Sequence, residues 1–214
     1  MNVLVIGANG KIGKQLVKLL SESGEHTPTA MIRDEKQKPD FEEMGAKTAV
    51  ADLEDRTEAL AAAMDGMDAV VFTAGSGGHT GPDKTLLIDL DGAAKAVEAA
   101  RQKGISRFLM VSAIGADDRD RWSDQIRPYF VAKHHADNIL RESGLDYTIV
   151  RPGLLLDEAG TGRISAAEHL EPGGVPREDV ARVLFESLRT ENTRNRSFDV
   201  VSGETPVSDA LEKL

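Results

Sequence analysis

One pair of residues has the types and spacing that proton transfer needs. Tyr129 and Lys133 lie four positions apart in a segment with a helical pattern, so their side chains would share one helix face, about one turn apart. A free phenol has a pKa of about 10, which is too high for proton transfer at neutral pH, and a neighbouring ammonium would lower it. The pair is therefore a candidate general acid and base. The alternative interpretation is an interfacial Tyr beside a solvated Lys.

A glycine-rich turn follows the first apolar run of the chain. The sequence Gly7-Ala8-Asn9-Gly10-Lys11-Ile12-Gly13 comes directly after Val3–Ile6 and opens a segment with helical spacing. Gly7 would permit a tight turn, Gly10 would let the backbone approach a pyrophosphate, and Gly13 would let helix and strand pack closely. The amides at the helix N-terminus would then bind phosphates. A Walker loop is excluded because no Gly-Lys-Ser or Gly-Lys-Thr follows, so the turn predicts a dinucleotide site.

The residue after the second apolar run bears on the choice of cofactor. Arg33 follows the expected strand Thr29–Ile32. An acidic residue at this place would bind the ribose 2′-hydroxyl of NAD, whereas an arginine accommodates the 2′-phosphate of NADP. Asp34 comes next, but Arg33 holds the strand-end position. We therefore predict NADP in preference to NAD, and the alternative is an ordinary solvated Arg.

No metal site is predicted. His134 and His135 are adjacent, so a helix would direct them about 100° apart, and neither His-x-x-x-His nor His-Glu-x-x-His occurs. The chain contains no Cys, which excludes disulfides, thiolate metal ligands and Cys nucleophiles.

Along the chain, short apolar runs alternate with longer segments of helical pattern. This alternation predicts an α/β fold, in which a doubly wound parallel sheet has helices on both faces. The expected strands are Val3–Ile6, Thr29–Ile32, Lys47–Val50, Ala69–Thr73, Arg107–Ser112, Tyr147–Val150 and Ser197–Val201. The expected helices are Lys11–Ser23, Arg56–Met64, Lys84–Lys103, Pro128–Glu142, Pro176–Thr190 and Val207–Leu214. We expect one Rossmann domain over residues 1–214, with the irregular stretch at about 153–175 as a minimal substrate cap.

Charge and hydropathy limit the partners. The 214 residues include 36 acids and 26 bases, for a net charge of −10, so sequence-independent binding to nucleic acid or an anionic membrane is not expected. No apolar run approaches a membrane span, and the N-terminus lacks the pattern of a signal peptide. We expect a cytoplasmic monomer or homodimer that binds a small-molecule substrate.

Taken in order, the motifs resemble the atypical and extended branch of the short-chain dehydrogenase/reductase superfamily, also called the NAD(P)-dependent epimerase/dehydratase family, with NmrA-like and flavin/biliverdin reductase-like relatives. The resemblance rests on Gly7–Gly13, Asp52-Leu53, Phe72–Gly75, Asp91-Gly92, Ser112, Tyr129–Lys133, Val150–Gly153 and Pro176–Ala181. It implies that the cofactor is bound by Gly7, Asn9, Gly10, Lys11, Ile12, Gly13, Arg33, Asp52, Leu53, Ala74, Gly75, Ser112, Lys133 and Pro152.

The same resemblance implies a catalytic set of Tyr129, Lys133 and Ser112, in which Lys133 also holds the nicotinamide ribose. In extended members the hydroxyl that polarises the carbonyl often lies two positions beyond Ser112, where this chain has Ile114. Ser112 is then either the hydroxyl at the reactive end, as in the flavin/biliverdin reductase type, or a strand-end serine bonded to backbone.

We expect an NADP-dependent oxidoreductase that transfers a hydride to or from a small substrate. Only 64 residues follow Val150, whereas relatives that bind nucleotide sugars devote a longer C-terminal region to that ligand, so a small aromatic, carbonyl compound, quinone or flavin is favoured. Two alternatives stay open. One is an epimerase or dehydratase that uses the cofactor transiently, and the other is a non-catalytic NADP sensor of the NmrA type.

Overall fold

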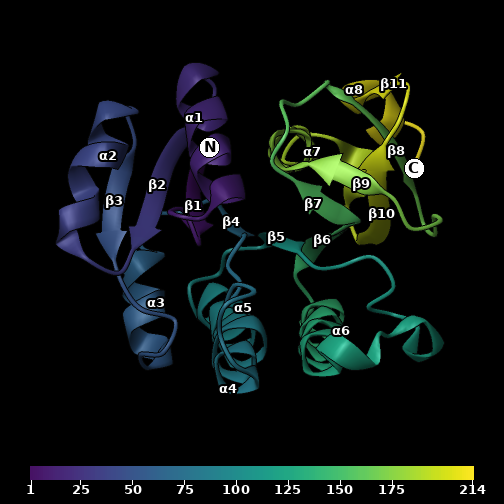
Figure 1. Cartoon of the computed structure of the whole chain (residues 1–214). Helices are drawn as coiled ribbons and strands as arrows, with labels where there is room; N and C mark the ends of the chain where they lie inside the picture. The colour runs from purple at the N-terminus through teal and green to yellow at the C-terminus, as the bar shows by residue number, and fades with distance from the viewer.

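The computed structural model describes residues 1–214 and contains eleven strands. They are β1 (Asn2–Ile6), β2 (Thr27–Ile32), β3 (Lys47–Val50), β4 (Ala69–Phe72), β5 (Arg107–Val111), β6 (Asp146–Pro152), β7 (Leu154–Leu156), β8 (Arg163–Ala167), β9 (Gly174–Pro176), β10 (Arg196–Ser202) and β11 (Thr205–Pro206). Nine of them form one sheet in the order β11-β8-β10-β6-β5-β4-β1-β2-β3 (Figure 1). From β10 to β3 every neighbouring pair is parallel, and β8 and β11 add an antiparallel edge.

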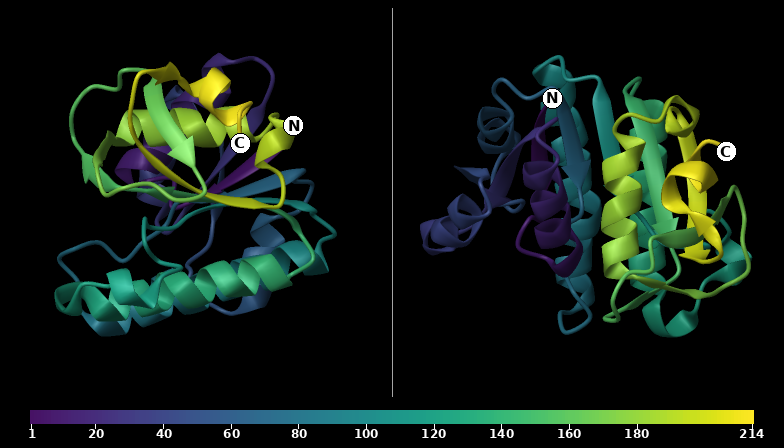
Figure 2. Two further views of the ribbon diagram at one scale, coloured as in Figure 1. Left: turned by 90° about the vertical axis from the view of Figure 1, so that its right-hand side faces the viewer. Right: turned by 90° about the horizontal axis from the view of Figure 1, so that it is seen from above.

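The helices cover both faces of this sheet. They are α1 (Lys11–Glu22), α2 (Lys38–Glu43), α3 (Thr57–Ala63), α4 (Pro82–Lys84), α5 (Ala93–Gln102), α6 (Arg127–Glu142), α7 (Arg177–Ser187) and α8 (Val207–Leu211), and a π-helical segment, η2 (Thr85–Gly92), joins α4 to α5. Figure 1 shows α1, α7 and α8 above the sheet and α3, α5 and α6 below it, and the side view in Figure 2 separates the two layers.

The first strand shows why this arrangement follows from the sequence. Val3 and Val5 belong to the core cluster under α1 and α7, whereas Leu4 and Ile6 belong to the cluster over α3, α5 and α6. Successive side chains of a strand point to opposite faces, so a strand covered on both faces must be apolar at every position. The continuous run at the start of the chain therefore becomes a central strand.

The predicted fold class and the single doubly wound sheet are confirmed, with three differences in detail. Residues 153–175 were expected to be irregular, but they contain β7 and β8, and β8 pairs with β10 through Val200 and Ala166. A short helix, α2, was also not predicted. The helix expected over Lys84–Lys103 is interrupted by the π-helical η2, which changes the direction of its side chains.

Candidate dinucleotide-binding and catalytic site

The glycine-rich turn between β1 and α1 is shaped by close backbone contacts. Gly7 has a φ of +81°, and a Cβ at this position would lie 2.5 Å from Ala74 N. A Cβ on Gly13 would lie 2.3 Å from Gly7 O, so any residue other than glycine would clash at this position. Gly10, the N-cap of α1, donates its amide to Gly7 O at 2.9 Å and has no side chain to cap the first turn. The first amides of α1 are thus left open to an anion.

A cavity of about 500 Å³ extends from this turn along the carboxyl ends of β1, β2 and β4. Of the residues predicted to bind a cofactor, those that line it are Gly7, Asn9, Gly10, Arg33, Leu53, Ala74 and Gly75. Ligands of open α/β sheets bind in the crevice beyond the carboxyl ends of the strands. The bare backbone of the turn, the helix N-terminus and the length of the cavity together fit the adenosine and pyrophosphate parts of a dinucleotide.

The two charged residues after β2 have different roles. The Asp34 carboxylate accepts the backbone amide of Lys36 at 2.9 Å and caps the short helical turn Glu35–Gln37. Arg33 contributes only its backbone amide to this turn, through Gln37 Oε1 at 3.1 Å, and its exposed side chain lines the cavity. The carboxylate next to the expected ribose site is therefore engaged by its own backbone, whereas the guanidinium is free to face a ligand.

The other seven predicted cofactor residues do not line this cavity: Lys11, Ile12, Gly13, Asp52, Ser112, Lys133 and Pro152. The Asp52 carboxylate accepts the amide of Glu54 at 3.0 Å, so it caps its own turn and is absent from the cavity lining. Ile12 is buried in the core under α1. Lys11 Nζ lies 2.6 Å from Asp157 Oδ2, and hydrogen bonding from Lys11, together with Arg177, holds the pKa of Asp157 below its usual value. Only the backbone of Ile12 is left to bind a cofactor, and the Lys11 side chain joins the turn to the segment after β7.

One wall of the cavity is formed by the glycine-rich loop Gly75–Gly81, whose place after an apolar strand predicts that it lies near a site, and by α4. Ser76, His79 and Lys84 come from the loop after β4 and from α4, and Lys84 Nζ lies 2.6 and 2.8 Å from the two carboxylate oxygens of Glu54. Glu54 also lines the cavity. This ion pair spans from the loop after β3 to α4 and closes one side of the cavity. No motif marks it, because the two residues are thirty positions apart.

The Tyr129 and Lys133 pair lies on the first turns of α6, beside the end of β5. Lys133 Nζ is 5.7 Å from the centroid of the Tyr129 ring. The same ammonium donates to Val111 O at 3.2 Å and lies 3.2 Å from Asp89 Oδ1. Lys133 and Asp89 are both almost fully buried. Asp89 comes from η2, and the other oxygen of its carboxylate accepts the amide of Ser76 at 2.9 Å. The pair is thus connected to the cavity wall through Asp89.

The electrostatics of this pair differ from the sequence expectation. Burial raises the pKa of Tyr129 above its ordinary value; Lys133 lowers it, but Asp89 and Asp137 raise it further. Burial alone would lower the pKa of Lys133, yet the charges of Tyr129, Asp89 and Asp137 raise it. Lys133 lowers the pKa of Tyr129, as predicted from sequence, but burial and the two carboxylates outweigh this effect and leave the pKa raised. The neutral phenol is favoured chiefly because burial disfavours the phenolate, and the negative charges of Asp89 and Asp137 add to this effect.

Ser112, the third predicted catalytic residue, lies just beyond β5 and is buried. Its hydroxyl has no hydrogen-bond partner of good geometry, and it lies close enough to Asp137 to lower the pKa of that carboxyl. Burial outweighs this effect and leaves the pKa of Asp137 raised. Asp137 is one turn beyond Lys133 on α6, so Ser112 faces the buried side of this helix. Ile114 follows, donating its amide to Pro152 O at 3.0 Å.

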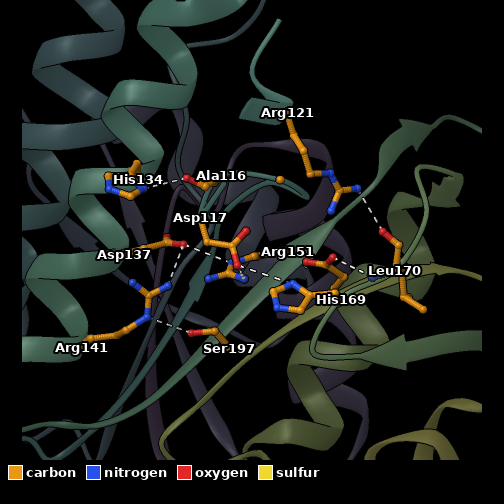
Figure 3. Close-up of polar contacts among 12 residues, drawn as sticks. Ala116, Asp117, Arg121, His134, Asp137, Arg141, Arg151, His169, Leu170 and Ser197 are labelled. Atoms are coloured by element: carbon orange, nitrogen blue, oxygen red, sulfur yellow. Dashed lines mark hydrogen bonds and ion pairs between the residues drawn. The ribbon is translucent and has the colours of Figure 1, made fainter. Parts of the chain in front are cut away.

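Arg151, on β6, is the central cation of a buried polar cluster that includes Asp137 of α6. Its Nε lies 3.3 Å from Asp137 Oδ2 and its guanidinium nitrogen lies 2.7 Å from Asp117 Oδ2. Figure 3 shows this row of charges, with His169 beyond it at 3.7 Å from the Asp117 carboxylate. A second link in the figure joins Arg121 to the carbonyl of Leu170 at 3.1 Å. The loop before α6 is thereby joined to the segment between β8 and β9.

The fold and the glycine cradle define a dinucleotide-binding protein of the Rossmann type. The chain belongs to the NAD(P)H-binding family, whose model matches residues 7–191. This confirms the resemblance to atypical short-chain dehydrogenase/reductases inferred from the motifs.

Individual relatives cover the whole chain. A Bacillus subtilis (strain 168) protein named as an uncharacterized sugar epimerase, YhfK, is 55% identical over 214 residues, 100% of both chains. Sanguinarine reductase of Eschscholzia californica is 26% identical over 99% of this chain and 93% of its own. Among solved structures, ChuY, an anaerobilin reductase of Escherichia coli O157:H7, has a TM-score of 0.81 and 25% identity over 95% of this chain and 98% of its own. The oxidoreductase ylbE of Lactococcus lactis has a TM-score of 0.91 and 32% identity, covering 100% and 96%.

Two further observations bear on the sequence predictions. None of the helices combines the length and apolar character needed to cross a bilayer. The structure also brings together no group of three or more His, Asp or Glu side chains suited to a metal ion.

Proposed function

We propose that the protein is an NADP-dependent reductase of a small carbonyl compound or quinone, in which Tyr129 is the proton donor. The observation that carries the proposal is the position of Tyr129 and Lys133 on one face of α6, linked by Asp89 to the cavity wall at Ser76. Tyr129 lies outside the cavity lining, so we assign its phenol to the nicotinamide end of the dinucleotide, beyond Ser76. The names of two relatives, both reductases, support the same class of reaction.

The preference for NADP rests on Arg33. Because Asp34 caps the following turn, the only charged side chain that the end of β2 offers to the cavity is a guanidinium. A planar guanidinium binds a 2′-phosphate by charge-assisted hydrogen bonds, and it offers nothing equivalent to a bare 2′-hydroxyl.

The residues of the chain then have separate tasks. The backbone of the glycine turn and the N-terminus of α1 would bind the pyrophosphate, and Lys133 would orient the nicotinamide ribose. A dinucleotide bound there would supply the hydride, and with it two electrons, for the carbonyl carbon of the substrate. Tyr129 gives its proton to the substrate oxygen, so the products are an alcohol, the oxidised cofactor and a phenolate that regains its proton from water.

The test is a search for turnover with purified protein. NADPH oxidation, followed by loss of its absorbance, should occur with members of a panel of small carbonyls and quinones, and Tyr129→Phe should remove most of it. Tight NADPH binding with no oxidation across the panel would contradict the proposal and favour a sensor.

An epimerase is the second candidate, because the relative with 55% identity is named as a sugar epimerase. Such an enzyme withdraws a hydride and returns it, so NADPH is not consumed. Conversion of a sugar substrate to its epimer without net change in the cofactor would replace the reductase with this activity.

A further inference from the structure

A buried carboxylate lies between the cofactor cavity and the catalytic helix, and no sequence motif points to it. Asp89 is 1% exposed, and its Oδ1 is 3.2 Å from Lys133 Nζ. Its Oδ2 accepts the amide of Ser76 at 2.9 Å, and a Cβ placed on Gly75 would be 3.1 Å from Oδ1. The carboxylate thus contacts both the wall that borders the cofactor and the ammonium next to Tyr129.

The π-helical segment η2 is the reason that Asp89 is inside the protein. Thr85, Asp89 and Gly92 are buried, whereas Leu86 and Leu87 on the same segment are exposed. Wider π-helical turns are rare and occur frequently at functional sites, where they redirect a side chain. Here the turn places a charged residue against α6 and leaves two leucines outside.

We propose, resting on the reductase function above, that Asp89 is a positioning residue that neutralises the Lys133 ammonium and so keeps Tyr129 in the protonated form that reduction requires. An isolated ammonium beside a phenol stabilises the phenolate strongly in a buried site. When a carboxylate already shares that ammonium, the phenolate gains less and is also repelled by the carboxylate. The arrangement therefore favours Tyr129 as a general acid, which donates a proton, over Tyr129 as a general base, which accepts one.

Of the carboxylates near Tyr129, Asp89 is the one that depends on Lys133 for its positive partner. The charges that act on the phenol are Lys133 and Asp137 on its own helix and Asp89 on η2. Asp137 has its own cation, because Arg151 lies 3.3 Å from it. Asp89 has only Lys133 as a cationic partner. The effect of Asp89 on Tyr129 is in the direction that the proposal requires, since it raises the pKa of the phenol.

The experiment titrates the phenol directly and needs no turnover. The ultraviolet absorbance of phenolate is recorded against pH for the full chain, and Tyr129→Phe assigns the signal, because the chain has only one other tyrosine, Tyr147. Asp89→Asn should move the Tyr129 midpoint down by about one to two pH units. Asp91→Asn removes the same charge from the same segment, but Asp91 is exposed and pairs with Lys95 at 3.0 Å, so this control should leave the midpoint in place.

A midpoint in Asp89→Asn that equals or exceeds the wild-type value would overturn the proposal, even in an active reductase. If the midpoint falls but the protein shows no NADPH turnover, the role of Asp89 stands and the reductase function fails. Should Asp89→Asn not fold, the double variant Asp89→Asn/Lys133→Met decides, because removing both charges should restore folding if the two form a compensating pair. A double variant as unstable as the single one would contradict the pairing.

Discussion

The Lys133 ammonium lies 5.7 Å from the centre of the Tyr129 ring, yet the pKa of the phenol is raised above its ordinary value by burial, with the neighbouring carboxylates adding to the effect. The proton donor for reduction is the neutral phenol. A raised pKa keeps this form populated to higher pH, so kcat/KM for reduction should not decline until the pH exceeds about 10, the ordinary tyrosine value. A pH profile of NADPH-dependent reduction measures this, and a decline centred near neutrality would contradict it.

Two glycines of the turn between β1 and α1 should have different roles, Gly10 in cofactor binding and Gly13 in stability. Gly10 has an ordinary φ of −72°, and a Cβ there would meet only Gly7 O at 3.2 Å. Gly10→Val should therefore block the approach of a pyrophosphate and abolish NADPH binding, with little loss of stability. Gly13→Ala is the matched contrast, because its Cβ would lie 2.3 Å from Gly7 O and the variant should lose about 1–3 kcal/mol of stability. NADPH titration measures the first effect and thermal unfolding the second. If Gly10→Val bound NADPH as tightly as the wild type, the glycine turn would not be the pyrophosphate site.

Cofactor choice depends on Arg33. If its guanidinium binds the 2′-phosphate, Arg33→Ala removes a charge-assisted contact worth about 1.5–3 kcal/mol. The Kd for NADPH should rise by about ten- to a hundredfold, while that for NADH should hardly change. Fluorescence titrations with both cofactors measure this, and a wild-type protein that already prefers NADH would refute the assignment.

The buried cluster around Arg151 makes a prediction about stability. Arg151→Met removes the nearest cation of Asp137, at 3.3 Å, and leaves this 1% exposed carboxylate with Arg141 at 3.7 Å; loss of a partner from a buried ion pair costs about 3–5 kcal/mol. The double variant Arg151→Met/Asp137→Leu should recover part of this loss, because it also removes the buried carboxylate and leaves only Asp117 without its Arg151 contact. Urea unfolding of the three proteins measures the effect, and a double variant no more stable than the single one would contradict it.

The loss of stability in Arg151→Met should depend on pH, and the pKa of Asp137 sets its direction. Burial raises the pKa of Asp137, so the folded protein holds this proton at a pH where the unfolded chain has lost it. Stability from this group is present below the unfolded pKa and is lost as the pH rises through the folded pKa. In Arg151→Met the pKa of Asp137 should rise further, and the loss of stability should therefore shrink as the pH is lowered.

Much of the fold and the phosphate end of the site could be predicted from sequence, because the responsible signals are local. The apolar run Val3–Ile6, the spacing of Gly7, Gly10 and Gly13 and the four-residue step from Tyr129 to Lys133 each act over one element. The structure places all of them as the patterns predicted.

The other features depend on contacts between distant segments. Asp89 is inside only because η2 is π-helical, and helical periodicity does not predict that turn. The Asp52 carboxylate caps a turn instead of facing the cavity, and Ser112 faces Asp137, neither of which is encoded by residue type. β8 becomes a strand because β10 lies beside it to receive its hydrogen bonds.

The most direct test of the central claim, that Tyr129 donates the proton in an NADPH-dependent reduction, is the turnover of Tyr129→Phe with a carbonyl substrate that the wild type reduces. A carbonyl is required because a flavin can take its proton from water. The variant keeps the ring and its packing, so NADPH should bind as before, while kcat should fall by about 10²–10⁴-fold. An unchanged kcat in Tyr129→Phe would contradict the account, because the hydride would then be transferred without the residue assigned as the acid.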